Sequence, residues 1–252
     1  MKRQATGILV LLSLILAPFP ALADEDGAAI VNKAFEYMRG ETSKSVVEMT
    51  IQRPDFTRTM VIKGWTKGKS DALFFIESPP KDAGNGTLKK GRDMWTYNPK
   101  VNRTIKLPPS MMSQAWMGSD FSNDDLSKTD SLVEDYDHTV TAEKEMDGMK
   151  VYELTSIPHE DAAVVWGKLE LTIRENGVLL REAFFDEDGL LVKEMTNSEV
   201  AELGGRLFPK VWTMKKAGET DRFTQLTYQE LAFDVKLPPN LFSLSSLKTK
   251  RR

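Results

Sequence analysis

Hydrophobic and polar residues alternate along most of this chain, and alternation with a period of two predicts β-strands. The alternating segments are short and rich in β-branched and aromatic residues, and they lie between residues 46 and 107 and again between residues 139 and 235. Asp147-Gly148, Asn176-Gly177 and Asp188-Gly189 separate neighbouring segments, and such dipeptides are strong signals for hairpin turns. We therefore expect about eleven antiparallel strands, joined mainly by hairpins.

Two regions depart from this alternation. Residues 26–38 place their apolar side chains near one helical face and are followed by Gly40, a common helix stop, so they predict an amphipathic helix at the start of the domain. Pro108-Pro109 end the first group of strands, and residues 110–128 mix methionine and aromatic residues with small polar ones. We expect a long loop that carries short helices there.

Each predicted strand has a charged face and an apolar face. In the segment 166–173, Leu169 and Leu171 fall on one face, and Lys168 and Glu170 fall on the other. This pattern suits a single curved antiparallel sheet with one solvated face as well as it suits a sandwich of two sheets. The alternation by itself leaves both architectures open.

The first 23 residues have the order of a secretory signal peptide. Lys2 and Arg3 supply the positive start, residues 7–20 form an apolar run, and Ala21-Leu22-Ala23 matches a small-residue cleavage site. The run is shorter than the ~20 residues that span a bilayer, no cysteine follows it as in a lipoprotein, and no later segment is long and apolar enough to span. We expect a soluble exported protein whose mature chain, residues 24–252, folds as one domain.

Composition and motifs argue against several classes of function. A net charge of −3 does not suit a nucleic-acid-binding protein, and the absence of cysteine removes disulfides, thiolate metal sites and cysteine nucleophiles. His138 and His159 have no partner at a useful spacing, and the chain lacks the HExxH and GxSxG motifs of metalloproteases and serine hydrolases. We expect no enzyme activity, no catalytic residue, no metal and no cofactor.

The segment 111–121 is unusually apolar for a loop, because surface loops are normally polar. Its large hydrophobic residues are Met111, Met112, Trp116, Met117 and Phe121. These side chains must be covered, and two interpretations are open. The segment is either a helical lid that completes the core, or a lid that caps an apolar cavity in which flexible methionines adapt to ligands of variable shape.

A motif of about 30 residues joins the end of the first strand group to this apolar segment. It comprises Trp95-x-Tyr97-x-Pro99, Arg103, Leu107-Pro108, Met117-Gly118-Ser119-Asp120-Phe121-Ser122 and Asp125-Leu126. With these residues the chain resembles the outer-membrane lipoprotein-sorting family, the relatives of the periplasmic lipoprotein carrier LolA. The order of signal peptide, helix, strands, helical loop and further strands agrees with that family.

The resemblance implies a mainly β fold: one curved antiparallel sheet forms an incomplete β-barrel of about eleven strands, covered by short helices, with a hydrophobic cavity for acyl chains. It implies a monomeric periplasmic carrier that moves a lipid or lipoprotein between envelope membranes, with transient membrane contact, an RND-type inner-membrane transporter and an outer-membrane acceptor as partners. The alternative is a non-catalytic envelope sensor or scaffold of the same fold. The family's carrier also uses an arginine in its lid; Arg53, Arg58 and Arg103 are available, and no motif assigns the role.

The candidate residues for the cavity or its lid come from two places. The loop contributes Met111, Met112, Trp116, Met117 and Phe121, and the sheet contributes Trp65, Phe75 and Trp95. For each sheet residue, an ordinary aromatic of the core is an equally good interpretation, since large aromatic side chains dominate cores as well as ligand sites.

Overall fold

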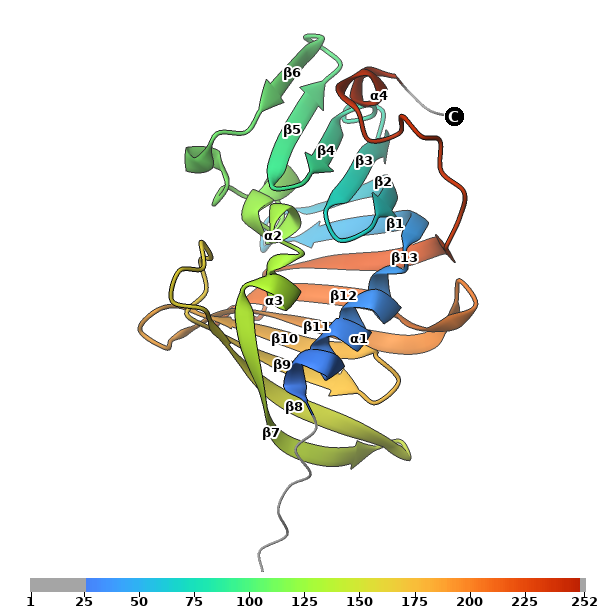
Figure 1. Cartoon of the computed structure of the whole chain (residues 1–252). Helices are drawn as coiled ribbons and strands as arrows, with labels where there is room; N and C mark the ends of the chain where they lie inside the picture. The colour runs from blue at the N-terminus through green and yellow to red at the C-terminus, as the bar shows by residue number, and fades with distance from the viewer. Residues whose placement is uncertain (1–25, 250–252) are drawn as a thin grey trace, which may run out of the picture.

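The computed structural model describes residues 26–249 and builds them around one open antiparallel sheet of thirteen strands (Figure 1). The expected signal peptide, residues 1–23, lies outside the described residues. The strands are β1 Thr42–Gln52, β2 Thr57–Lys67, β3 Asp71–Ser78, β4 Gly86–Lys90, β5 Asp93–Asn98, β6 Arg103–Lys106, β7 Tyr136–Met146, β8 Met149–Pro158, β9 Lys168–Arg174, β10 Leu179–Phe185, β11 Leu191–Leu203, β12 Arg206–Lys216 and β13 Phe223–Phe233. The predicted single curved sheet is confirmed, with two more strands than the eleven expected.

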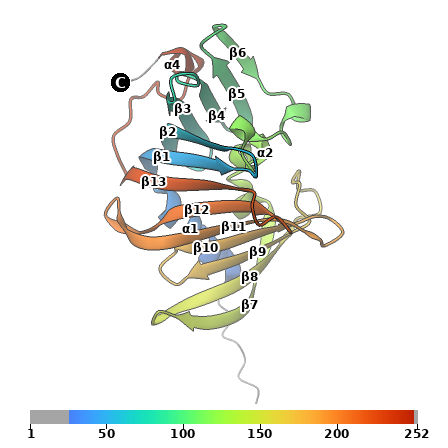
Figure 2. The same ribbon diagram turned by 180° about the vertical axis from the view of Figure 1, so that it is seen from behind.

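Two meanders make up the sheet. Strands β1 to β6 follow one another on one side, strands β7 to β13 follow one another on the other, and pairing of β1 with β13 joins the two groups. The sheet therefore ends at β6 on one edge and at β7 on the other, and it does not close into a barrel. The helices α1, α2 and α3 lie over one face of the sheet, and Figure 2 shows the opposite face, which the segment after β13 covers at β2–β4.

The opening helix α1, Gly27–Arg39, confirms the amphipathic segment expected from the sequence. Asp26 caps its first turn, since its side chain accepts a hydrogen bond from the backbone N–H of Ala28 at 3.0 Å. The helix stops at Gly40, whose φ of 67° is a conformation that glycine adopts easily. At the other end, a Cβ on Gly27 would lie 2.4 Å from the carbonyl oxygen of His138, so glycine lets the helix pack directly on β7.

The connection between β6 and β7 carries the short helices that the sequence predicted. They are the 3-10 helices η1 Pro109–Met111 and η2 Trp116–Gly118, and the α-helices α2 Asn123–Ser127 and α3 Ser131–Glu134. A reciprocal pair of hydrogen bonds between Ser122 and Asp125 caps α2. We call residues 108–122 the lid segment.

Strand β4 does not show the alternation of the other strands. Its first four residues are all buried, so hydrophobic and polar positions do not alternate. One of these four residues is a lysine, Lys89, which is 1% exposed and donates from Nζ to the Asp130 carboxylate at 3.1 Å. Burial lowers the pKa of Lys89, and the Asp130 carboxylate opposes that effect.

Apolar side chains gather in three clusters, two on the helix-covered face of the sheet and one on the opposite face. The helix cluster joins α1 to β8–β12 and includes Val31, Leu154, Leu171, Ile173 and Phe184. The lid cluster lies against the lid segment and includes Met49, Ile51, Met60, Met94 and Trp116. The C-terminal cluster joins β2–β4 to the segment that follows β13 and ends in α4, Leu244–Lys248; it includes Trp65, Leu73, Phe75, Leu241 and Leu247.

Candidate functional site

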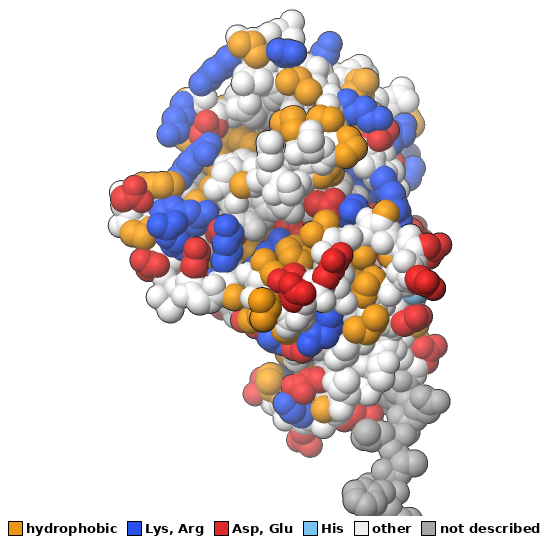
Figure 3. Space-filling view, turned by 90° about the vertical axis from the view of Figure 1, so that its left-hand side faces the viewer, with side chains coloured by type: hydrophobic (Ala, Val, Ile, Leu, Met, Phe, Trp, Pro, Cys, Tyr) orange, Lys and Arg blue, Asp and Glu red, His pale blue; other side chains and the backbone are white. Residues whose placement is uncertain are grey.

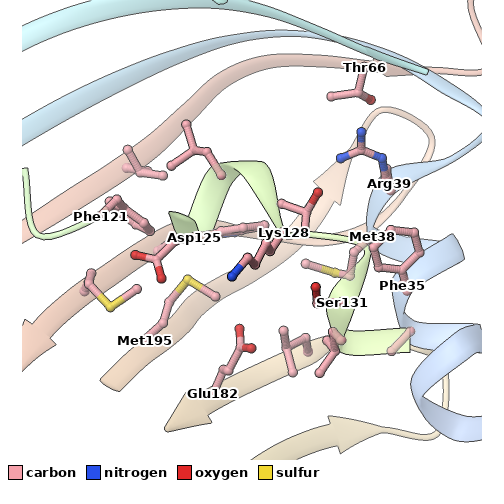
Figure 4. Close-up of a pocket in the computed structure, with 18 of the residues that line it drawn as sticks. Phe35, Met38, Arg39, Thr66, Phe121, Asp125, Lys128, Ser131, Glu182 and Met195 are labelled. Atoms are coloured by element: carbon pink, nitrogen blue, oxygen red, sulfur yellow. The ribbon is translucent and has the colours of Figure 1, made fainter. Parts of the chain in front are cut away.

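A cavity of about 370 Å³ lies between the sheet and the helices α1, α2 and α3. Its walls are mostly apolar: α1 contributes Phe35 and Met38, and the strands contribute residues such as Val47, Leu179 and Leu226. Figure 4 shows part of this lining, with the side chains of α1, α2 and the strands directed into one space. An apolar chamber of this size falls within the ~300–1,000 Å³ typical of small-molecule sites.

The cavity reaches the surface at the connection between β8 and β9. Val164, Val165 and Trp166 of this connection line the cavity, and Val165 is 50% exposed. Figure 3 shows the side of the molecule that carries this connection, with hydrophobic side chains grouped across its middle and acidic ones among them. An exposed apolar group beside a cavity is a feature of ligand or membrane contact sites.

Two of the predicted site residues, Trp116 and Phe121, line this cavity. Both are buried, at 6% and 8% exposure. The indole Nε1 of Trp116 donates a hydrogen bond to the hydroxyl of Thr87 at 3.1 Å, and its ring meets Phe74 edge-on with 5.9 Å between the ring centroids. The lid segment is therefore fixed to the sheet at the place where it borders the cavity.

The three methionines of the lid segment lie elsewhere. Met111, Met112 and Met117 are half-buried against the lid cluster, and none of them lines the cavity. Their side chains cover the inner face of β1, β2 and β5, so in this part the lid segment completes a core. The interpretation in which the methionines form the roof of the cavity does not match this placement.

The three aromatic residues predicted from the sheet also lie away from the cavity. Trp65 and Phe75 are buried in the C-terminal cluster, and Trp95 packs against it. They are separated from the cavity because they point to the opposite face of the sheet: their strand neighbours Gly64 and Phe74 line the cavity, and the chain after β13 covers the opposite face with Leu241 and Leu247. The interpretation as core aromatics fits their place in the fold.

The aromatic wall of the cavity comes instead from the second half of the chain. Phe184, Phe208, Trp212 and Tyr228 line it, and the rings of the last three pack against one another with centroids 5.0 to 5.8 Å apart. The sequence analysis missed these residues. A signal was present, because Phe208 and Trp212 are four positions apart on one strand and so share a face.

Two of the three candidate arginines hold the lid segment. The guanidinium of Arg53 binds both carboxylate oxygens of Asp120 at 3.1 Å, and the Asp120 side chain is only 5% exposed. Arg58 donates to the backbone carbonyl of Met117 at 3.3 Å and pairs with Asp82 at 3.0 Å. Arg103 is exposed at the start of edge strand β6. Arg53 and Arg58 therefore tie the lid segment to the sheet from the two ends of the β1–β2 turn.

Charged side chains interrupt the apolar lining beside α2. Lys193 forms an ion pair with Asp125, and Lys128 forms one with Asp124 at 3.1 Å. Glu182 of β10 faces the same space, and burial, reinforced by the charge of Asp125, raises its pKa to about 7. In Figure 4 the Asp125, Lys128 and Glu182 side chains all point into the chamber. The sequence analysis did not single out these residues.

Within residues 26–249, no three metal-binding side chains of the His, Cys, Asp and Glu types come together. The two histidines differ in setting. His138 lies in β7 rather than in a turn, and its Nδ1 is 2.7 Å from the Ser156 hydroxyl, while His159 lies 3.4 Å from the Asp137 carboxylate.

No helix among the described residues is long and apolar enough to cross a membrane.

Solved structures with the same architecture identify the fold. A DUF1329 family protein from Desulfovibrio piger is similar with a TM-score of 0.78 and 24% identity, over 88% of this chain and 97% of that one. A putative outer membrane lipoprotein-sorting protein domain from Vibrio parahaemolyticus gives 0.76 and 22%, over 88% and 98%. A LolA superfamily protein from Nitrosomonas europaea gives 0.72 and 23%, over 88% and 99%.

An open sheet with an apolar chamber under its helices, together with these likenesses, defines a protein of the LolA-like fold. A family model whose description reads "Uncharacterized protein" matches residues 68–249, which is more than half of the chain, and the chain belongs to that family. No curated protein matches the sequence significantly. The resemblance found in the sequence is thus confirmed at the level of the fold.

Proposed function

We propose that this protein is a periplasmic carrier that binds the acyl chains of a lipid or lipoprotein in its cavity and transfers them between envelope membranes. The observation that supports this most directly is the apolar cavity of about 370 Å³ between the sheet and α1–α3, which reaches the surface at Val165. The printed name of the Vibrio parahaemolyticus relative, a lipoprotein-sorting protein domain, agrees with it.

The energy of such binding is sufficient without any catalytic group. Each methylene removed from water contributes about 0.8 kcal/mol, so a chain of roughly sixteen carbons contributes on the order of 10 kcal/mol. Binding of the acyl chain is therefore strongly favourable, and its release to the acceptor is the step that limits transfer. A lid segment held by a few polar contacts, such as those of Arg53 and Arg58, gives a way to open the cavity at an acceptor without ATP.

The partners follow from this role. Cargo drawn from one membrane and delivered to another requires a donor and an acceptor, so we propose transient membrane contact, an RND-type transporter at the inner membrane and an acceptor at the outer membrane. Export by the expected signal peptide, residues 1–23, would bring the protein to the compartment between them. The competing function is a sensor or scaffold that holds no lipid, for which an open interior has no use.

Two matched variants on β1 test the carrier. Ser45 lines the cavity, and Lys44, its neighbour, is exposed on the other side of the strand. Ser45→Trp places an indole in the chamber, whereas Lys44→Trp adds the same group outside. Protein purified from the periplasm without detergent is extracted with organic solvent, and the lipid is quantified by mass spectrometry.

The carrier predicts co-purified lipid in the wild type and in Lys44→Trp, and a loss of most of it in Ser45→Trp, with all three proteins folded by circular dichroism. Lipid-free wild-type protein that also takes up no lipid from vesicles would support the scaffold instead. Equal lipid in all three proteins would show that the lipid is bound outside the cavity.

A further inference from the structure

Glu182 occupies a position on the sheet where a hydrophobic residue is expected. In the strand register its neighbours are Leu171 on β9 and Met195 on β11, and both belong to the helix cluster. Phe184, two residues along the same strand, points to the same side and is buried in that cluster. Glu182 is therefore a single acid in the apolar inner surface of the sheet.

The acids on the outer surface beside it are all paired. Arg181 of the same strand bridges Glu170 on β9 and Glu194 on β11, at 3.6 Å and 2.5 Å. Glu182, by contrast, makes no hydrogen bond and no ion pair with any other residue of the described range 26–249. The charged residues closest to it in the chamber already have partners, since Lys193 binds Asp125 and Lys128 binds Asp124.

Glu182 is half-buried, and a carboxyl that loses part of its hydration without gaining an ion-pair partner destabilises the fold. Leucine or methionine, the residues beside it in the register, would fill the same place without that cost. Strongly perturbed acids in a cavity are typical of functional positions. The side chain is also directed into the chamber, where a ligand would lie against it, as Figure 4 shows.

We propose that Glu182 binds a hydrogen-bond-donating group, an amine or a hydroxyl, carried by the lipid that occupies the cavity. The inference rests on the proposed carrier function and narrows its cargo to lipids that bring such a donor inside the chamber. The hydrocarbon part would lie along the aromatic wall formed by Phe208, Trp212 and Tyr228.

The charge around the site favours a donor over an anion. Asp124, Asp125 and Glu182 line the chamber together with Lys128 and Arg39. Lys128 pairs with Asp124, Lys193 pairs with Asp125, and Arg39 donates to the backbone carbonyls of Gly68 and Asp71, so the charge of ionised Glu182 has no ion-pair partner. An ammonium group would balance that charge, and a hydroxyl would donate to the carboxylate or accept from the carboxylic acid. A carboxylate headgroup bound beside Glu182 would bring two negative charges together.

Three probes of equal chain length test this: dodecylamine, dodecanol and dodecanoate. Delipidated protein is titrated with each below its critical micelle concentration, and binding is followed by the fluorescence of Trp116, Trp166 and Trp212, which line the cavity. The variants are Glu182→Gln and the matched outer-surface control Glu170→Gln. We expect the wild type and the control to bind the amine and the alcohol at least about tenfold more tightly than dodecanoate.

In Glu182→Gln the amine should lose about tenfold in affinity and dodecanoate should gain, so that the preference disappears. If the wild type binds all three probes equally, or if Glu182→Gln keeps the preference, Glu182 is not the anchor and the carrier function stands. If the wild type binds none of them and also takes up no lipid from vesicles, the carrier function itself is wrong. If Glu182→Gln does not fold, Glu182→Leu takes its place in the comparison, because leucine suits a position whose neighbours in the register are apolar.

Discussion

The guanidinium of Arg53 and the carboxylate of Asp120 form a two-pronged ion pair, with 3.1 Å between each nitrogen and oxygen, that joins the β1–β2 turn to the lid segment. Thr224 of β13 adds a hydrogen bond from its hydroxyl to the same carboxylate at 2.7 Å. Asp120 is thus held by two neighbouring strands. Planar pairs of this kind are stronger and more directional than single contacts.

We expect Asp120→Asn to loosen the lid segment. The substitution leaves Arg53, with its side chain only 15% exposed, without a counter-charge, so a loss of about 1–3 kcal/mol in the free energy of unfolding is expected. Local opening should make backbone amides of residues 108–122 exchange hydrogen faster, which mass spectrometry measures. Asp93→Asn is the control, because the Asp93–Lys106 pair is more than half exposed and contributes little. Equal protection in Asp120→Asn and the wild type would mean that apolar packing alone holds the segment.

Glu182 makes the stability of the protein depend on pH in a predictable direction. Its pKa is about 7 in the folded protein and about 4.5 when unfolded, so the folded state binds the proton more tightly. Stability should therefore fall as pH rises from about 4.5 to 7, by roughly 1–3 kcal/mol once solvent in the chamber is allowed for. Glu182→Gln removes this contribution. In thermal unfolding, the Tm of the variant relative to that of the wild type should therefore rise between pH 5 and pH 8.

The change with pH in the Tm difference between the wild type and Glu182→Gln reports on Glu182 alone, because every other titrating group is common to both proteins. A difference in Tm that stays constant from pH 5 to pH 8 would show that Glu182 is ionised throughout and solvated.

The C-terminal cluster predicts unequal effects of two leucines of α4. Leu247 is fully buried, and its Cδ1 lies 2.8 Å from where a Cβ on Gly86 would be. Leu247→Ala should lower the free energy of unfolding in urea by about 2–4 kcal/mol, since it removes buried methyl groups and leaves a space. Leu244, on the same helix, is 47% exposed, and Leu244→Ala should change stability by less than about 1 kcal/mol. Equal effects would mean that α4 does not dock on β4.

The buried pair between Lys89 and Asp130 predicts a rescue. Asp130→Asn leaves the buried Lys89 ammonium without its counter-charge and should cost about 3–5 kcal/mol. Lys89→Met in the same chain removes that charge, so the double variant should recover most of the loss. Urea unfolding of the four proteins in this cycle measures the coupling. If the double variant is as unstable as Asp130→Asn, Asp130 stabilises the fold at the start of α3 rather than through its ion pair with Lys89.

The sequence predicted the architecture well because the fold follows local patterns. Period-two alternation and Asp-Gly or Asn-Gly turns define most strands, and the Gly40 stop defines α1. The burial of Lys89 in strand β4 was not predictable, because the partner that makes it possible, Asp130, is 41 residues away. No local pattern contains that information.

The site was less predictable, for a reason that is also physical. Alternation shows that Gly64 and Trp65 lie on opposite faces of the sheet, and it does not show which positions meet the helices, the C-terminal segment or an open chamber. That depends on how the sheet curves and on where the chain after β13 returns. Glu182 did leave a signal, as an acid spaced by two from Leu180 and Phe184.

The pairing of β1 with β13 has a consequence for the order of events in folding. Ser43 lies opposite Phe233 in that ladder, so the strand formed near the beginning of the chain waits for a neighbour synthesised near its end. Contacts so distant in sequence slow folding, because a long loop must close before they form. The sheet therefore becomes continuous only after nearly the entire polypeptide is available.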